Sequence, residues 1–363
     1  MEEIRDTNSQ DQTAPARRVR ISDLATALGL TKSTVSRALN DYADIAPDTR
    51  ERVRTMAAQM GYAPMPYAQA VRTGRVRALG LVLELDAPDR YGPFLADFLG
   101  GITQEASLEG WTLTIASSTS RADMEATLAR LLQEHKVDGF ILPRTRIHDP
   151  RALFLRAKGV PFVLYGRVGY GQPDPGLSWY DVDGRGAMRD GVARLVALGH
   201  KRIAFVGPCE AYNFAMLRRD GYRDGLALAQ IAHDPALEIM GVSDRAEGAA
   251  AARALLDLPD PPTAIVYATD ATALGAYDVA RERGLTIGRD LSLIAYDGIP
   301  EGRMIEPPLT TFAVDSRHAG ERLAALLIAQ LRGAPVADLT ELVSAQLQPG
   351  GSDGPPVFTK RET

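Results

Sequence analysis

Apolar residues in the first sixty positions of the chain recur at helical spacing, in three short stretches separated by turn residues. In the first stretch, Leu24, Ala25 and Leu28 form one apolar stripe, and Gly29 follows it. This pattern predicts a helix from about residue 23 to residue 28, with Ser22 as its N-cap and Gly29 as its end.

The second stretch has a narrow apolar side and a wide polar side. Val35 and Leu39 form an i, i+4 pair, and we expect the helix to open at Thr31 or Lys32. Its polar side carries Lys32, Ser33, Thr34, Ser36, Arg37 and Asn40. A short buried seam below a long polar face is typical of a helix that lies in a DNA major groove. An ordinary surface helical hairpin is the alternative.

A third helix and a proline-containing linker follow. Pro47 stands at a first-turn position, and apolar residues recur at helical spacing up to Gly61. Pro64 and Pro66 then interrupt the helical pattern, although Pro66 is also well placed to open a short helix that ends at about Arg72. A disordered tether is the other interpretation of this segment.

From residue 78 onward, strand-length apolar runs alternate with amphipathic helical stretches, in two series of similar length. This alternation predicts parallel sheets with helices on both faces. Strands are predicted at 79–85, 111–116, 139–142, 161–165, 178–182, 202–206, 264–267 and 291–296. Helices are predicted at 94–109, 123–135, 184–198, 218–229, 246–256 and 270–283.

Composition changes this picture mainly through the distribution of charge. The chain of 363 residues has a net charge of -5, yet basic residues outnumber acidic ones between Arg17 and Arg75. That region therefore has the local positive field that phosphates require. The apolar runs are too short to span a membrane, the first residues are polar, and Cys209 is the single cysteine. We expect a cytoplasmic protein with no membrane partner, no metal and no cofactor.

The N-terminal region resembles the lactose-repressor (LacI/GalR) family of bacterial transcription regulators, because many residues match the family at fixed offsets. The matching residues are Asp23-Leu24-Ala25, Ala27, Gly29-Leu30-Thr31, Thr34-Val35-Ser36-Arg37, Leu39-Asn40, Thr49-Arg50, Val53, Gly61-Tyr62 and Pro64. The likeness continues over about residues 19–345, since the family joins such a head to the two-lobe fold of the periplasmic binding proteins.

This resemblance implies an N-terminal all-α helix-turn-helix head, a hinge helix, and a two-lobe α/β domain with doubly wound parallel sheets. The implied boundaries are 1–18 for a disordered tail, 19–63 for the head, 64–76 for the hinge, 77–348 for an effector-binding and dimerisation domain, and 349–363 for a flexible tail. The first lobe would comprise about 77–177 and 315–333, and the second about 178–312 and 336–348.

The resemblance also implies contacts with double-stranded operator DNA. The base-reading residues would be Lys32, Ser33 and Arg37. The phosphate-binding residues would be Thr31, Thr34, Ser36 and Asn40. In the hinge, Ala68 and Gln69 would face the minor groove, and Val71 would be the wedge that opens a central base step. The family usually has leucine at that wedge position and asparagine where Met65 stands.

A small-molecule site is expected outside the carboxyl ends of the strands, where ligands bind in open α/β sheets. Asp, Arg and Asn side chains suit the hydroxyl groups of a carbohydrate, and aromatic side chains suit the apolar face of its ring. The candidate residues are Tyr91, Phe94, Arg144, Thr145, Arg167, Trp179, Asn213, Phe214, Arg218, Thr269, Asp270 and Asp297. The resemblance singles out Arg218, in an Arg-x-x-Gly-Tyr motif, and Asp297, which follows a tyrosine at a strand end.

Several of these loops resemble those of family members that respond to α-glucosides. The resemblance thus implies a homodimeric repressor that releases its operator when a sugar binds. The opposite response, in which the sugar is a corepressor that strengthens operator binding, is the alternative. A solute-binding protein with the same two lobes is a second class. An enzyme is a third class, which we do not expect, because the sequence has no GxSxG elbow, no P-loop and no metal-ligand set.

Overall fold

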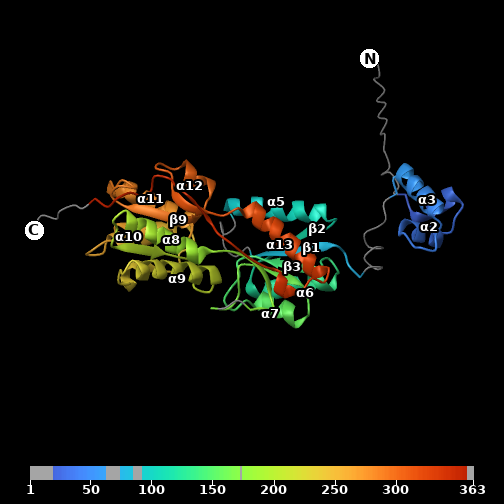
Figure 1. The fold of residues 1–363 in the computed structure, drawn as a ribbon, viewed down its shortest axis with the longest axis horizontal. Coiled ribbons are helices and arrows are strands. Elements are labelled where there is room, and N and C mark those ends of the chain that lie inside the picture. The colour runs from blue at the N-terminus through green and yellow to red at the C-terminus, as the bar shows by residue number, and fades with distance from the viewer. Residues whose placement is uncertain (1–18, 63–73, 85–91, 172–173, 358–363) are drawn as a thin grey trace, which may run out of the picture. The chain divides into compact units, whose positions relative to one another are not determined.

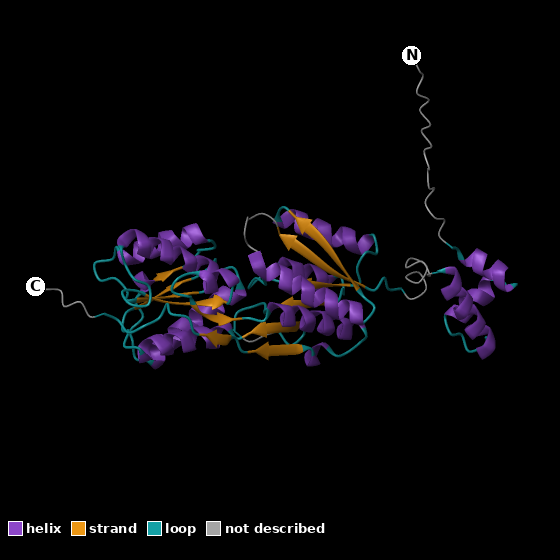
Figure 2. Ribbon diagram, turned by 90° about the horizontal axis from the view of Figure 1, so that it is seen from above, coloured by secondary structure: helices purple, strands orange, loops and turns teal. Residues whose placement is uncertain are grey.

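The structure of the protein is a computed structural model, which describes residues 19–62, 74–84, 92–171 and 174–357. The chain divides into two units, Met1–Val76 and Arg77–Thr363. All the described strands belong to the second unit, and the described part of the first unit has helices joined by short loops (Figures 1 and 2). Among the described residues, no helix combines the length and the apolar character that crossing a membrane requires.

Three short helices form the first unit: α1 (Ile21–Leu28), α2 (Lys32–Leu39) and α3 (Pro47–Met60). They enclose a small core in which Leu24, Val35, Ala38 and Val53 are fully buried. The predicted three-helix arrangement is confirmed; Leu39 is half-buried and packs against this core, in which Ala38 is also buried. The hydrophobic seam of α2 therefore includes Ala38 in addition to the predicted pair Val35 and Leu39.

The start of α1 differs from the prediction. The helix begins at Ile21, so Ser22 lies inside it and is not the N-cap. The carboxylate of Asp23 accepts a hydrogen bond from Arg20 N at 2.9 Å, which satisfies a backbone donor at the helix start. Gly29 ends α1 as predicted, with a φ of 64° that glycine adopts without steric cost.

The first lobe of the second unit is built on a parallel six-stranded sheet in the order β11-β5-β4-β3-β1-β2. The strands are β1 (Ala78–Glu84), β2 (Thr112–Ser118), β3 (Gly139–Leu142), β4 (Phe162–Tyr165), β5 (Ser178–Val182) and β11 (Thr340–Val343). The helices are α5 (Gly92–Leu108), α6 (Arg121–Gln133), α7 (Pro150–Ala157) and α13 (Ser316–Leu331). Helices α5 and α13 pack on one face of the sheet, and α6 and α7 pack on the other.

The second lobe has a six-stranded sheet in the order β12-β10-β9-β8-β6-β7, parallel except for β12. Its strands are β6 (Ile203–Val206), β7 (Glu238–Ile239), β8 (Ala264–Tyr267), β9 (Ser292–Asp297), β10 (Thr310–Ala313) and β12 (Gln346–Gln348). Helices α8 (Gly184–Ala197) and α9 (Asn213–Leu228) cover one face, and α10 (Arg245–Leu256) and α11 (Asp270–Arg283) cover the other. A short helix, α12 (Pro300–Met304), follows β9.

All the predicted strands are present, but two segments belong to the other lobe. Strand β5 pairs with β4 and β11 in the first sheet, whereas residues 178–182 were predicted to open the second lobe. Strand β11 also joins the first sheet, so of the predicted segment 336–348 only β12 reaches the second. The apolar pattern of a strand does not specify its sheet, because the pairing partner is distant in sequence.

The prediction of a flexible tail from residue 349 is wrong for its first part. Ser352 is fully buried; its Oγ accepts a hydrogen bond from Thr310 N at 2.8 Å and donates one to Leu293 O at 2.7 Å. The carbonyl oxygen of Gly354 lies 2.8 Å from Nε2 of the buried His200. Glycine-rich composition here permits close backbone packing, since a Cβ on Gly354 would lie 2.1 Å from the carbonyl oxygen of Gly288.

Candidate functional site

A cavity of about 790 Å³ lies between the two lobes, at the carboxyl ends of their strands. Residues of both lobes line it, as the topology of open α/β sheets predicts. The first lobe contributes Arg144, Thr145, Tyr165, Gly166 and Asp181. The second lobe contributes Phe214, Leu217, Arg218, Thr269, Tyr296 and Asp297. Of the residues predicted from sequence, Arg144, Thr145, Phe214, Arg218, Thr269 and Asp297 therefore line one cavity.

Arg218 is fixed at the cavity wall by contacts with several neighbours, which include the Phe214 ring at 4.9 Å from its Cζ. Helix α9 begins at Asn213, five residues earlier than predicted, which places Arg218 in its second turn. The guanidinium donates from Nη1 to Ala268 O at 2.6 Å, and its Cζ lies 3.7 Å from the centroid of the Tyr296 ring. The carboxylate of Asp297 is 3.7 Å from Nη1. The side chain is only 11% exposed, so its position is set by packing as well as by charge.

Asp297 ends strand β9 with a φ of 123°, in the region that L-residues rarely adopt. Burial, together with the nearby Asp270, raises the pKa of this carboxyl group to about 7, against the opposing effect of Arg218. The carboxyl group therefore changes its protonation state near neutral pH.

Asp270 was predicted to contact a ligand, but it does not line the cavity. It is fully buried at the start of α11, where its carboxylate accepts hydrogen bonds from Gly298 N at 2.8 Å, Ile299 N at 2.9 Å and Thr311 Oγ1 at 2.6 Å. Asp270 thus holds the loop that follows Asp297. Burial raises its pKa, and the three donors act in the opposite direction.

Asp181 is a cavity residue that sequence reasoning missed. It lies in β5, one residue from the carboxyl end of the strand, and its carboxylate accepts from Arg167 Nε at 2.7 Å. Arg167 in turn stacks at 5.6 Å on the ring of Trp179. The predicted pair Arg167 and Trp179 therefore supports a cavity residue instead of lining the cavity. A polar residue at the end of an apolar strand was the available signal for Asp181.

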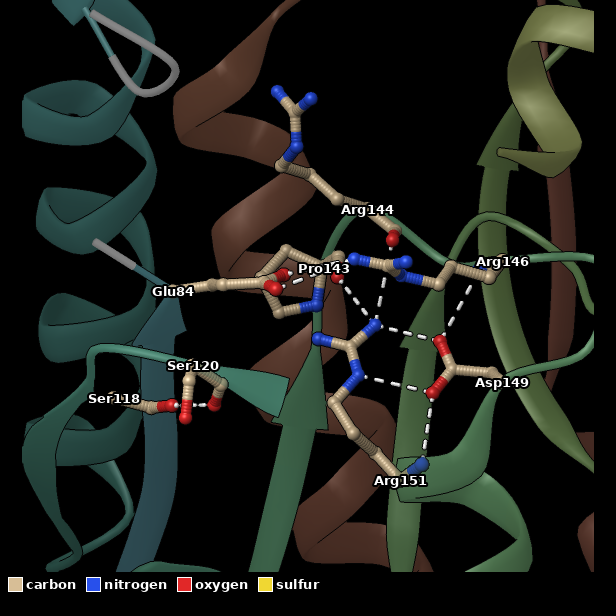
Figure 3. A network of polar contacts seen from close by, with 8 residues as sticks. All are labelled: Glu84, Ser118, Ser120, Pro143, Arg144, Arg146, Asp149 and Arg151. Carbon is tan, nitrogen blue, oxygen red and sulfur yellow. Dashed lines mark hydrogen bonds and ion pairs between the residues drawn. The ribbon is translucent and has the colours of Figure 1, made fainter. Parts of the chain in front are cut away.

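A polar network behind the cavity wall fixes the loop that carries Arg144 and Thr145 (Figure 3). The buried Arg151 donates to the carbonyl oxygens of Pro143 at 2.9 Å and Arg144 at 3.3 Å. It also pairs with Asp149 through two hydrogen bonds, of 3.0 and 2.7 Å. Arg151 therefore holds both ends of the turn after β3, a structural role that the sequence analysis did not predict.

The two lobes are joined along one edge of the cavity by backbone hydrogen bonds. Asn213 N donates to Thr145 O at 3.1 Å, and Ile147 N donates to Ala211 O at 3.0 Å. The side chain of Asn213 donates to Gly169 O at 2.6 Å. Asn213, predicted to contact a ligand, is thus a contact between lobes. Two other candidates cannot be placed, since Tyr91 and the side chain of Phe94 lie outside the described residues.

In the head, α2 presents part of the predicted DNA-binding surface. Lys32, Ser33 and Arg37 are exposed, as base reading requires. The hydroxyl of Thr31 accepts a hydrogen bond from Thr34 N at 3.1 Å as the N-cap of α2, and Asn40 Nδ2 donates to Ser36 O at 2.6 Å. The predicted hinge contacts Ala68, Gln69 and Val71 lie outside the described residues.

The sequence matches two family models: the bacterial regulatory proteins of the lacI family over residues 20–65, and the periplasmic binding protein-like domain over residues 192–352. It is 35% identical to the HTH-type transcriptional regulator AglR of Rhizobium meliloti (strain 1021), over 93% of this chain and 95% of AglR. The chain belongs to the LacI family of bacterial regulatory proteins. This LacI-family protein is accordingly a DNA-binding transcriptional regulator, not the solute-binding protein that the sequence left as an alternative.

Solved structures of the LacI family agree with the fold. The complex of the transcriptional regulator CelR with cellobiose is 28% identical, with a TM-score of 0.71 over 92% of this chain and all of that one. The lac repressor dimer bound to operator and the anti-inducer ONPF is 25% identical, with a TM-score of 0.76 over 93% of this chain and 99% of that one. The helix-turn-helix head and two-lobe α/β domain of the prediction are thus confirmed.

Proposed function

We propose that this LacI-family regulator is a cytoplasmic repressor, which binds operator DNA as a homodimer and is controlled by a carbohydrate held in the interlobe cavity. The observation that carries the proposal is the composition of that cavity. Carboxyl and guanidinium groups converge there from both lobes, next to aromatic rings. The carbohydrate acts as an effector and is not turned over.

The cavity has the chemistry that vicinal hydroxyl groups need. A carboxylate accepts two hydrogen bonds and a guanidinium donates several, so Asp181, Asp297 and Arg218 suit a polyol. Phe214 and Tyr165, which line the cavity and are partly exposed, add aromatic surface for the apolar face of a sugar ring. The solved structure of a relative, CelR, is a complex with cellobiose, which supports a carbohydrate as the ligand class. The α-glucoside-like loops make a disaccharide of glucose our first candidate.

On the DNA side, Lys32, Ser33 and Arg37 read base edges, and Thr31, Thr34, Ser36 and Asn40 hold phosphates. Residues 64–76, with Ala68, Gln69 and Val71, form the hinge that enters the minor groove. Two heads are needed for two half-sites about one helical turn apart. The operator-bound dimer of the lac repressor supports this assembly.

A ligand changes the conformation of such a regulator only if its affinity differs between two conformations of the protein. A carbohydrate that contacts both lobes favours one lobe separation over another. We propose that the favoured state holds the hinge segments in a geometry that weakens operator binding, so the ligand is an inducer.

The full-length protein tests the proposal directly. An operator is first selected from a random double-stranded DNA library. The affinity of the protein for this operator is then measured with and without maltose, trehalose, sucrose, melibiose or cellobiose. Each sugar is used at 10 mM, about ten times a Kd of 1 mM. We expect one of these sugars to lower operator affinity about tenfold or more. Tighter operator binding with a sugar would make it a corepressor. Operator binding that none of the sugars changes would contradict carbohydrate control, while leaving the DNA-binding function intact.

A further inference from the structure

The arginine on the recognition helix has a carboxylate partner in the next loop. Arg37 lies in the last turn of α2, with its side chain 46% exposed. Its Nη2 forms an ion pair and hydrogen bond with Oδ2 of Asp44. Its guanidinium carbon also lies 5.4 Å from the centroid of the Tyr42 ring. The guanidinium is therefore held from two directions while it remains accessible to solvent.

Backbone hydrogen bonds hold this loop in place. Tyr42 N donates to the carbonyl oxygen of Arg37 at 3.1 Å, and Ile45 N donates to the carbonyl oxygen of Tyr42 at 3.1 Å. Ile45 packs against the core of the head, which anchors the far side of the loop. Asp44 is thus carried by a folded turn and not by a freely moving chain.

We propose that Asp44 is a positioning residue that sets how strongly the head discriminates its operator from other DNA, by holding Arg37 in a base-reading orientation. The inference rests on the proposed function, in which Arg37 reads a base. It adds that the negative charge of Asp44, beside the recognition helix α2, makes the head more selective for its operator.

The geometry of a guanidinium explains how one arginine serves both partners. Its five N–H donors form a planar fork, so one edge bonds the carboxylate while the other remains available for a guanine. An arginine without such a partner is attracted to any phosphate, and phosphate contacts carry no sequence information. Asp44 competes with phosphates for Arg37 on every DNA sequence, whereas a guanine in the correct position leaves the ion pair intact.

The same loop provides a matched control. Asp41 forms an ion pair with Arg54, and its Oδ1 lies 3.8 Å from Nη1 of Arg50; both arginines belong to α3. Asp41→Asn removes the same charge from the same loop, but it leaves the partner of Arg37 in place. The long-range electrostatic effect of a lost carboxylate is therefore measured separately from the loss of positioning.

The experiment compares full-length wild type, Asp44→Asn and Asp41→Asn, with fluorescence anisotropy on the selected operator and on a scrambled duplex of equal length. Both variants should bind the scrambled duplex more tightly, since each removes one negative charge. Only Asp44→Asn should reduce the operator-to-scrambled affinity ratio, by about tenfold, the lower range for one bidentate base contact. Asp44→Glu, which restores the charge, should recover most of the ratio.

Each result has a distinct meaning. Equal ratios for Asp44→Asn and Asp41→Asn would overturn the inference. In an Arg37→Ala background, Asp44→Asn should leave the ratio unchanged; a further decrease would mean that Asp44 acts without Arg37, which also overturns it. If Arg37→Ala itself leaves the wild-type ratio intact, the proposed base-reading role of Arg37 is wrong. Thermal unfolding of each variant reports whether the head remains folded.

Discussion

The recognition helix and the interlobe cavity use the same pair of chemical groups in different surroundings. On α2, the Arg37 and Asp44 side chains are 46% and 50% exposed. In the cavity, Arg218 is 11% exposed and Asp297 is 38% exposed. An exposed pair contributes about 0–1 kcal/mol to stability and is screened by salt. In the cavity, Arg218 is shielded from most solvent and the pKa of Asp297 is raised, so substitutions there should affect ligand binding more strongly than substitutions in the exposed pair affect stability.

The largest expected contrast between the two surfaces is in their response to salt. Between 50 and 200 mM KCl, operator affinity of the full-length protein should fall by about a thousandfold, because the cationic heads displace counterions from the DNA. Affinity for the inducing disaccharide should change by less than about threefold, since a neutral ligand displaces no counterions and the charges around it are partly shielded from solvent. Anisotropy and calorimetric titrations on the same preparation measure both quantities.

A second salt provides the control for that contrast. Replacing chloride with glutamate at constant K⁺ concentration distinguishes anion effects on the protein from counterion release by the DNA. An equally steep salt dependence of sugar binding would contradict the proposed comparison, because it would mean that the protein takes up or releases ions when the neutral sugar binds.

Removal of Arg218 should have the next largest effect. Arg218→Ala deletes a charged donor and leaves the Asp297 carboxyl group without its neighbouring cation. We expect sugar affinity to fall by about a hundredfold, corresponding to about 3 kcal/mol for a hydrogen bond to a charged group. Operator affinity without sugar should remain within about twofold of wild type, because the head is unchanged. Calorimetry and anisotropy provide the two readouts.

Arg223→Ala is the matched control on the same helix, since Arg223 pairs with Glu238 and does not line the cavity. This variant should retain sugar binding. A parallel loss of sugar binding and operator binding in Arg218→Ala would instead show that Arg218 is required mainly for folding.

The same comparison explains what the sequence predicted well. The head was predicted almost completely, because helix caps, the apolar stripe and glycine stops are local features within a few residues of each other. Gly29 ends α1 where predicted, whereas Ser22 lost the cap position to Arg20, whose N–H meets the Asp23 carboxylate. Such shifts of about two residues depend on competing local hydrogen bonds, which spacing alone does not rank.

The cavity was predicted less completely because it is assembled from distant segments. Sequence placed Arg218 and Asp297 at strand and helix ends, and both line the cavity. It also placed Asp270 there, although that carboxylate points to the backbone of residues 298 and 299. Whether a strand-end residue faces the cavity or the wall behind it depends on packing between segments. For the same reason, the sequence did not predict that β5 joins the first sheet.

A smaller effect is expected from pH, and it is confined to the cavity. The raised pKa of Asp297, about 7, means that the folded protein retains this proton in a range where the unfolded chain has lost it. The contribution to stability is fully present below about pH 4, the pKa of an unfolded aspartate, and is lost as the pH rises to about 7. If the ionised carboxylate accepts hydrogen bonds from the sugar, sugar affinity should rise about tenfold from pH 6 to pH 8.

Asp297→Asn separates this carboxyl group from others that titrate in the same range. The variant should bind sugar more weakly, and with the same affinity at pH 6 and pH 8. A tenfold rise that persists in Asp297→Asn would assign the pH dependence to another group.

The smallest expected change tests whether the exposed surface of the head also supports its fold. Thr31 caps α2 by accepting a hydrogen bond from Thr34 N, and its Oγ1 lies 2.9 Å from Thr34 Oγ1. Thr31→Ala should lower the free energy of unfolding of the head by about 1 kcal/mol, as is typical for a lost N-cap. Thr31→Ser keeps the cap hydroxyl and should be close to wild type in urea titrations monitored by far-UV circular dichroism.

If Thr31→Ala weakens operator binding without destabilising the head, the hydroxyl acts as a phosphate contact, and the cap contributes little. If both quantities fall, one exposed hydroxyl serves the helix and the DNA together, and the separation between binding and folding on this surface is incomplete.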